Sequence, residues 1–205
     1  MRIRPVGAHA LLIDCADADQ VETWRAELWR RREHGQLTAI EIVPAATTVL
    51  LDGVPDPASA AARIAAWQPR TDAPPPTASA APVEVPVTYD GEDLPVVAGH
   101  WGVDVPAVIE RLGRTPFRVA FCGFAPGFAY LTGLPAELAV PRLPTPRPRV
   151  PAGSIALAGP YAGIYPAASP GGWLLVGRTD LALFDVHADP PARLTPGTPV
   201  RLVAA

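Results

Sequence analysis

The chain has 205 residues, of which 49% are hydrophobic and 18% are charged, and its formal net charge is −3. This length suits one large or two small domains with a packed core, and the small negative charge gives no electrostatic reason to expect nucleic acid or an anionic membrane as a partner. The apolar runs, such as Ala10 to Ile13, are far shorter than the roughly 20 residues of a membrane span, and the N-terminal segment lacks an apolar signal core. We therefore expect a cytoplasmic protein.

The cysteine, histidine and proline content further limits the kinds of fold and site that the chain can form. Cys15 and Cys122 lie far apart without a Cys-x-x-Cys pair, and the four histidines are scattered, so no disulfide scaffold and no metal site are predicted. The 27 prolines are more than twice the average usage of about 5%, which leaves room for few long helices.

The first segment, residues 1–70, has the pattern of an α/β unit. Asp17 or Asp19 can cap a helix whose apolar face carries Val21, Trp24 and Leu28. The expected elements, in chain order, are a strand at 10–14, a helix at 20–32, strands at 38–43 and 47–51 that form a hairpin, and a second helix from Asp56 or Ser59 to about Trp67. This order, β-α-β-β-α, is most of a ferredoxin-like split unit.

Residues 71–82 are rich in proline and alanine and contain almost no bulky side chain. Such a composition favours an extended, semi-rigid linker, and we place the domain boundary there.

The second segment, residues 83–205, begins with alternating valines from Val83, an edge strand because Pro86 cannot donate to a ladder. Two short helices follow at 93–98 and 106–112, the second capped by Asp104. Short strands are then expected at residues 117–121, 154–158, 173–176, 183–186 and 200–203. Many short strands between glycine and proline turns favour a closed barrel or a sandwich. On the strand at 183–186 and just beyond it, Asp185 and His187 would face the same side, as a polar surface pair or as an acid/base pair.

The stretch from Cys122 to Thr179 combines glycines, prolines, aromatic residues and four arginines. Glycines let the backbone approach a ligand, prolines stiffen loops, and guanidinium groups offer planar forks to a carboxylate or a phosphate. Taken one by one, these residues also suit the turns, core and surface ion pairs of any small barrel.

The order of the motifs is more specific than their composition. The run Gly123-Phe-Ala-Pro-Gly-Phe-Ala-Tyr-Leu131, two Pro-Arg pairs, Val150-Pro-Ala-Gly-Ser154, Tyr165-Pro166, Ser169-Pro-Gly-Gly-Trp173 and Gly177-Arg-Thr179 resembles the allophanate hydrolase subunit 1 family. That family includes the B-type subunit of 5-oxoprolinase and the KipI-type inhibitor of a sporulation histidine kinase. The resemblance covers the chain from about Tyr89 and implies an α+β protein, in which the N-terminal α/β domain precedes a C-terminal cyclophilin-like β-barrel.

For function, the resemblance implies the B-type subunit of an ATP-dependent 5-oxoprolinase that is inactive alone. The implied partners are an allophanate hydrolase subunit 2 or C-type 5-oxoprolinase subunit and a third, lactam-utilisation subunit, and ATP is bound by this chain or by a partner. The alternatives are a KipI-type kinase inhibitor and an allophanate hydrolase or urea carboxylase-type subunit. A prolyl isomerase has only the implied fold in its favour.

The resemblance also indicates where a small-molecule substrate binds. The resemblance makes Arg142, Arg147 and Arg178 candidates for holding a carboxylate or phosphate. It makes Tyr130, Tyr165 and Trp173 candidates for the pocket walls. The full predicted substrate-binding set is Gly123, Phe124, Pro126, Gly127, Tyr130, Arg142, Arg147, Tyr165, Pro166, Gly171, Gly172, Trp173, Arg178 and Thr179. We expect these loops to form one stiff, arginine-bearing mouth that a companion chain completes.

No catalytic residue is assigned from the sequence. Many family members carry a histidine where this chain has Leu112, and Cys122 has no histidine nearby in the sequence, so we interpret Cys122 as a buried thiol.

Overall fold

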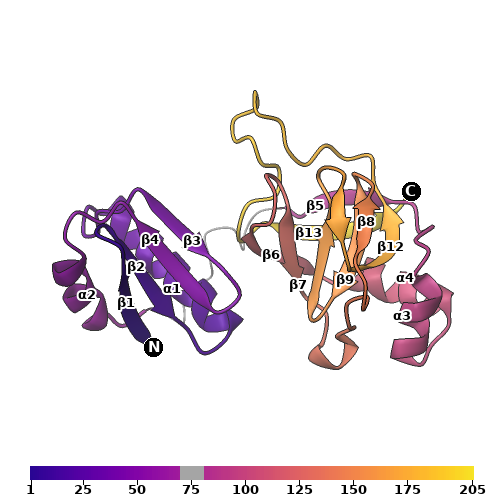
Figure 1. Ribbon diagram of the computed structural model, residues 1–205, viewed down its shortest axis with the longest axis horizontal. Coiled ribbons are helices and arrows are strands. Elements are labelled where there is room, and N and C mark those ends of the chain that lie inside the picture. Colours follow the sequence, from indigo (N-terminus) through magenta and orange to yellow (C-terminus); the bar gives the residue numbers. More distant parts are fainter. Residues whose placement is uncertain (70–80) are drawn as a thin grey trace. The chain divides into compact units, whose positions relative to one another are not determined.

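The computed structural model describes residues 1–69 and 81–205, and the chain forms two compact units, residues 1–79 and 80–205, each with its own sheet and helices (Figure 1). The predicted linker at 71–82 lies outside the described residues apart from its last two. In the described ranges, none of the helices combines the length and the apolar character that crossing a membrane requires.

The N-terminal unit is an antiparallel sheet, ordered β1-β2-β4-β3, that is covered by two helices. Both helices contribute to one core with the sheet, since Trp24 and Leu28 of the first helix and Ile64 of the second lie in the same buried cluster. The elements are β1 (Arg2–Val6), β2 (Ala10–Asp14), α1 (Ala18–Glu33), β3 (Glu41–Pro44), β4 (Thr48–Asp52) and α2 (Pro57–Ala65).

Local side-chain chemistry sets the helix starts of this unit. The carboxylate of Asp17 accepts a hydrogen bond from the backbone N–H of Gln20 at 2.8 Å, and that of Asp56 accepts one from Ser59 at 3.0 Å. The predicted caps and the predicted hairpin of β3 and β4 are confirmed.

Strand β1 was not expected. It pairs only with β2, and its sequence of arginines and a proline lacks the apolar alternation by which strands are recognised. Arg4 of β1 is held by Asp14 of β2 at 2.8 Å. The order is therefore β-β-α-β-β-α rather than β-α-β-β-α, and the ferredoxin-like description stays a prediction.

The C-terminal unit is a seven-stranded sheet, ordered β12-β9-β10-β7-β6-β13-β5, that curls into a nearly closed barrel (Figure 1). A bridge between Thr88, just after β5, and Arg178 of β12 joins the two ends of the sheet. The closed barrel expected from the short strands is thus confirmed in outline. The elements are β5 (Val83–Val87), α3 (Leu94–Trp101), α4 (Val105–Arg114), β6 (Phe117–Cys122), β7 (Ala129–Thr132), η1 (Ala136–Leu138), β8 (Arg147–Val150), β9 (Ser154–Ala158), β10 (Tyr161–Ile164), β11 (Ser169–Gly171), β12 (Leu174–Arg178) and β13 (Pro199–Ala204).

Helices α3 and α4 pack on each other and against β12 and β13. Their apolar residues, such as Val97, Trp101 and Leu112, belong to the same buried cluster as the barrel interior. The backbone N–H of Ala107 donates to the side chain of Asp104 at 2.9 Å, which confirms the predicted cap of α4.

The strand predicted at 183–186 is wrong. These residues lie in a long loop between β12 and β13, where Phe184 forms one isolated bridge with Ala192. The side chain of Asp185 accepts a hydrogen bond from the backbone N–H of His187 at 2.9 Å, and this local turn replaces the extended backbone that a strand needs. Asp185 and His187 are therefore not an alternating pair on a strand.

Alternate residues of the barrel strands build two separate cores. Leu131, Ile155 and Leu174 belong to the barrel interior, whereas their chain neighbours Ala156 and Leu175 belong to a second cluster. This second cluster lies on the outer face of the sheet and contains Phe128, Tyr165 and Trp173, together with Val150 of the β8–β11 pair. An aromatic layer therefore covers one outer side of the barrel.

Candidate functional site

A pocket of about 390 Å³ opens beside this aromatic layer. Its walls come from the loop before β7, the turn between β9 and β10, and the region around β11. The pocket brings together six of the predicted site residues: Phe124, Tyr130, Arg142, Tyr165, Gly171 and Trp173.

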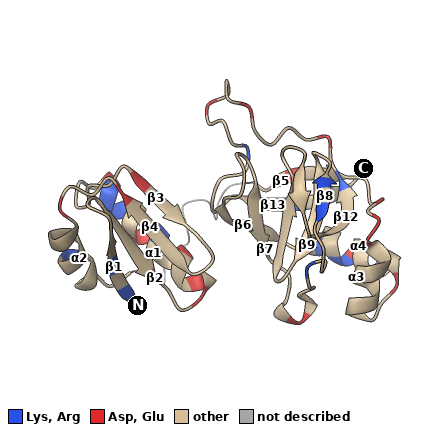
Figure 2. Cartoon of the chain, in the orientation of Figure 1, with Lys and Arg blue, Asp and Glu red and all other residues tan. Residues whose placement is uncertain are grey.

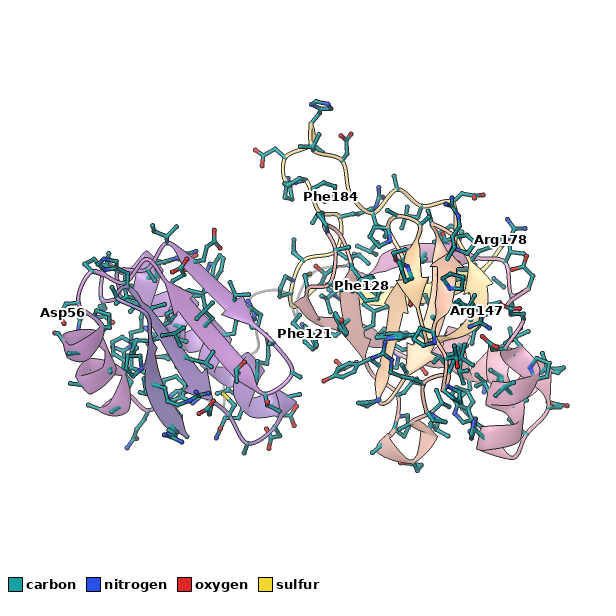
Figure 3. The ribbon with its side chains drawn as sticks, in the orientation of Figure 1. Asp56, Phe121, Phe128, Arg147, Arg178 and Phe184 are labelled. Atoms are coloured by element: carbon teal, nitrogen blue, oxygen red, sulfur yellow. The ribbon has the colours of Figure 1, made fainter. Side chains whose placement is uncertain are left out.

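Phe128, labelled in Figure 3, contacts three other aromatic residues of the pocket wall. Its ring meets Tyr165 at 5.3 Å and Trp173 at 5.6 Å between centroids, both edge to face, and Tyr130 at 5.0 Å. Tyr130 in turn stacks on Phe121, with 4.3 Å between the two ring centroids. Such pairs contribute roughly 0.5–1.5 kcal/mol each beyond the area they bury, so the wall is preorganised and stiff.

Phe124 stands at the mouth of the pocket in a strained conformation. It is the one non-glycine residue with positive φ in the described ranges, at 70°, and the residue is 62% exposed. A left-handed backbone costs a non-glycine residue about 1–2 kcal/mol. The tight turn around it, in which Ala125 donates to the carbonyl of Gly123 at 2.8 Å, keeps the ring edge-on to Phe128 and Tyr165.

Gly127 allows this turn to pack against the long loop between β12 and β13. Its φ is 81°, and a Cβ atom there would lie 2.7 Å from Cβ of Phe184. The exposed Phe184 therefore lies beside the Phe124 turn.

Arg142 supplies the only charged side chain among the residues that line the described pocket. It is exposed, and no carboxylate of the described residues lies within ion-pair distance of it. Burial raises the pKa of the Tyr165 phenol, and the nearby positive charges of Arg142 and Arg147 partly oppose this. Burial and the neighbouring Tyr130 also raise the pKa of Tyr161. The site thus combines neutral phenols, aromatic walls and one free guanidinium.

Arg147 lies outside the pocket wall and is held by two carboxylates. Its Nη2 donates to both oxygens of Asp93 at 2.8 and 2.9 Å, and its Nε pairs with Glu92 at 2.7 Å. Asp93 is 6% exposed and also accepts from the backbone N–H of Leu175 at 2.7 Å. This pairing ties α3, β8 and β12 together and favours a structural role for Arg147.

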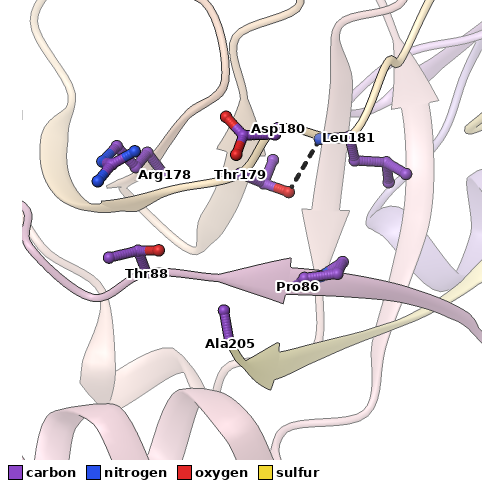
Figure 4. Close-up of a pocket in the computed structure, with 7 residues that line it drawn as sticks. All are labelled: Pro86, Thr88, Arg178, Thr179, Asp180, Leu181 and Ala205. Atoms are coloured by element: carbon purple, nitrogen blue, oxygen red, sulfur yellow. Dashed lines mark hydrogen bonds between the residues drawn. The ribbon is translucent and has the colours of Figure 1, made fainter.

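Arg178 and Thr179 line a different hollow, of about 290 Å³, with Thr88 and Asp180 among its other walls (Figure 4). Nε of Arg178 pairs with Asp90 at 2.7 Å, and the hydroxyl of Thr179 accepts from the backbone N–H of Leu181 at 3.2 Å. Figure 2 shows basic and acidic residues together in this region of the C-terminal unit. The structure therefore does not bring the three arginines into one mouth, because only Arg142 reaches the aromatic pocket.

The remaining predicted residues lie around the pocket rather than in its wall. Gly123, Pro126 and Gly127 belong to the turn that carries Phe124, and Pro166 directly follows Tyr165. Gly172 packs under Pro146, which is 3.6 Å from where its Cβ would be. Sequence reasoning missed Phe128 and Tyr161 as wall residues, although the Gly159-Pro160 turn signal would have placed Tyr161 at the start of a strand.

Cys122 was interpreted as a buried thiol, and the structure places it partly buried against the barrel core. Its Sγ donates to the carbonyl of Leu194 at 3.3 Å, and burial raises its pKa to about 11. Leu112, at the position where many family members carry a histidine, is fully buried in the barrel core. Across residues 1–69 and 81–205 there is no group of three histidine, cysteine or acidic side chains that could hold a metal ion.

One protein family covers most of the chain. A family described as "Carboxyltransferase domain, subdomain C and D" matches residues 1–194. The chain belongs to this family. Three curated proteins that carry the name of the B-type subunit of 5-oxoprolinase are 43–48% identical to it, which confirms the resemblance drawn from the motifs.

The matched stretches also show how much of each relative the chain represents. The protein from Escherichia coli O157:H7 is 48% identical over 124 residues, which are 59% of this chain and 57% of that protein, so the chain matches little more than half of its length. The crystal structure of TTHA0988 is similar with a TM-score of 0.76 and 34% identity, covering 97% of this chain and 40% of that one. PH0987 from Pyrococcus horikoshii, described as uncharacterized, has a TM-score of 0.58 and 32% identity, with 100% and 97% covered.

Proposed function

We propose that this chain is the B-type subunit of an ATP-dependent 5-oxoprolinase, a hydrolase of cyclic amides, and that it acts in the cytoplasm. The observation that carries the proposal is the aromatic pocket with a single guanidinium, in a chain whose three curated relatives share the name of that 5-oxoprolinase subunit. That shared name favours this function over a KipI-type kinase inhibitor or an allophanate hydrolase. In the same proposal, the N-terminal unit is ferredoxin-like and the barrel cyclophilin-like.

The pocket suits a small, flat, anionic ring. A lactam such as 5-oxoproline offers a nearly planar amide to the aromatic walls around Phe128 and one carboxylate to Arg142. The described pocket wall holds no histidine, cysteine or acidic residue that could act as nucleophile or general base. The chain therefore binds and orients the substrate, and a partner protein supplies the reacting groups.

Neither the aromatic pocket nor the hollow beside Arg178 suits ATP. A triphosphate needs several positive charges or a glycine-rich loop with a lysine, and the sequence contains no lysine. The 390 Å³ pocket offers one guanidinium, and Arg178 in the second hollow is already paired with Asp90. In our proposal the nucleotide is bound by a partner, and no step on this chain involves it.

Reconstitution tests this function. The chain is mixed with a C-type 5-oxoprolinase subunit and the lactam-utilisation subunit from the same genome, and 5-oxoproline-dependent release of phosphate and glutamate is measured. We expect activity from the three proteins together and none from the chain alone, because its pocket lacks reacting groups. A correctly assembled three-protein complex that consumes neither ATP nor 5-oxoproline would refute the proposal.

A further inference from the structure

The hydroxyl of Tyr165 is a polar group without an internal partner. The residue is 2% exposed and lines the aromatic pocket, yet its hydroxyl makes no hydrogen bond to any residue in the described ranges. The buried side-chain polar atoms of the described residues that lack a partner do not include this oxygen, so it is open to solvent in the pocket. A ligand group that enters the pocket would provide the missing partner.

The neighbouring backbone is shaped around this hydroxyl. A Cβ atom on Gly171 would lie 2.3 Å from Oη of Tyr165 and 2.9 Å from its Cζ, so any side chain at 171 would displace the phenol. The ring itself is fixed edge-on by Phe128 at 5.3 Å and by Phe124 at 6.3 Å. The hydroxyl is thus held in one place rather than free to reach another partner.

Arg142 is the charged neighbour of this phenol. It lines the same pocket, its positive charge acts on Tyr165, and it is not engaged by any described carboxylate. A phenol O–H and a guanidinium N–H are both donors that suit the oxygens of an anion. One cation balances one carboxylate, whereas a phosphate dianion would leave negative charge uncompensated in an aromatic pocket.

We propose that the Tyr165 hydroxyl and the Arg142 guanidinium together bind the carboxylate of a small cyclic amide, while the Phe128 wall contacts its ring. This assignment rests on the proposed function and gives Tyr165 a donor's role where the motif pattern indicated only a wall. Because burial raises its pKa, the phenol stays protonated and remains a donor at physiological pH. The absence of a side chain at Gly171 is then a requirement of the site.

The test uses the complete chain and two probes that differ by the carboxylate alone: L-5-oxoproline and 2-pyrrolidinone. Binding is followed by chemical-shift titration. We expect 5-oxoproline to bind at least about tenfold more tightly, and Tyr165→Phe and Arg142→Gln each to weaken it by about tenfold or more while leaving 2-pyrrolidinone unchanged.

Two matched controls remove the same groups elsewhere. Tyr89→Phe deletes a buried hydroxyl that has no partner and lies outside the pocket, and Arg149→Gln removes an exposed guanidinium of β8. Both should bind 5-oxoproline like the unmodified chain. Thermal unfolding of every variant confirms that the fold is kept.

Three results would overturn the inference: no binding of 5-oxoproline, equal binding of the two probes, or unchanged 5-oxoproline binding by Tyr165→Phe. Its failure is separable from that of the proposed function. An active three-protein complex whose KM for 5-oxoproline is unaffected by Tyr165→Phe refutes the carboxylate site and leaves the function standing. If the chain binds 5-oxoproline through its carboxylate but the three-protein complex is inactive, the proposed function is refuted and the carboxylate site stands.

Discussion

Replacing Asp93 by alanine is the sharpest test of how the barrel is held together. Asp93 accepts two hydrogen bonds from Arg147 and one from the backbone N–H of Leu175, and it is 6% exposed. The change would leave the Arg147 guanidinium with Glu92 and the backbone carbonyl of Trp173 as its remaining partners, and the backbone N–H of Leu175 without its acceptor. Three elements, α3, β8 and β12, would lose their common link.

The expected loss follows from burial. Removing one partner of a buried ion pair typically costs about 3–5 kcal/mol, because the other charge stays behind uncompensated. The Arg147 side chain is 21% exposed and keeps Glu92, so we expect the lower end of this range, about 3 kcal/mol. For a unit of roughly 100–150 residues this lowers the Tm by about 10 °C.

Urea and thermal unfolding measure the loss, and hydrogen exchange of peptides from β9 and β12 assigns it to the C-terminal unit. Glu92→Ala is the matched control, since it removes the exposed carboxylate from the same arginine. That pair is 64% exposed on the glutamate side, and its removal should cost no more than about 1 kcal/mol.

A structural role for Arg147 would be refuted by one particular outcome. If Asp93→Ala left stability within about 1 kcal/mol of the unmodified chain but changed the KM of the reconstituted complex, Arg147 would be a ligand-binding group as the motif pattern suggested. Equal losses in Asp93→Ala and Glu92→Ala would likewise contradict the argument from burial.

Three further predictions follow from single residues. Phe124→Gly should raise the free energy of unfolding by about 1 kcal/mol relative to Phe124→Ala, because only glycine relieves the positive φ, while both variants weaken 5-oxoproline binding; equal stability of the two would contradict strain. In a Cys15→Ser background, Cys122 should be alkylated by iodoacetamide at least about tenfold more slowly than a free thiol at pH 8, with the rate still rising towards pH 11, since burial raises its pKa to about 11. A rate plateau near pH 9 would disprove this. Burial raises the pKa of Glu27, but hydrogen bonds from Arg30 and Arg31 lower it more, so its net shift is downward and its contribution to stability is present above about pH 4 and lost as the pH falls through the folded-state pKa. Glu27→Gln should therefore be less stable than the unmodified chain at pH 7 and nearly equal to it at pH 2 in urea titrations, and a difference independent of pH would refute the linkage.

Local chemistry could be predicted from the sequence, and pairing between distant segments could not. The caps at Asp17, Asp56 and Asp104 were expected because each carboxylate acts on a backbone N–H three residues away. Strand β1 was missed because its sequence lacks apolar alternation, and its pairing depends on a partner strand elsewhere in the chain. The strand expected at 183–186 failed because the Asp185 side chain bonds to the backbone locally.

For the site, too, one part could be predicted from the sequence and another part could not. Motif order placed Tyr165, Trp173 and Arg142 in one region, and the structure gathers them around one pocket. The fate of the other two arginines was not predictable, because the carboxylates that hold them, Asp93 and Asp90, lie 54 and 88 positions away. Nothing in the local sequence distinguishes a guanidinium that is free from one that is paired over such a separation.

The parallel pairing of β5 with β13 makes the first and last strands of the C-terminal unit neighbours. The sheet is therefore complete only once β13, which lies between β6 and β5, has been synthesised. Because the pairing is parallel, the start of β5 and the end of β13 lie at opposite ends of the two strands, so a circular permutant opened in the long loop between β12 and β13 would need a linker that spans the length of this strand pair.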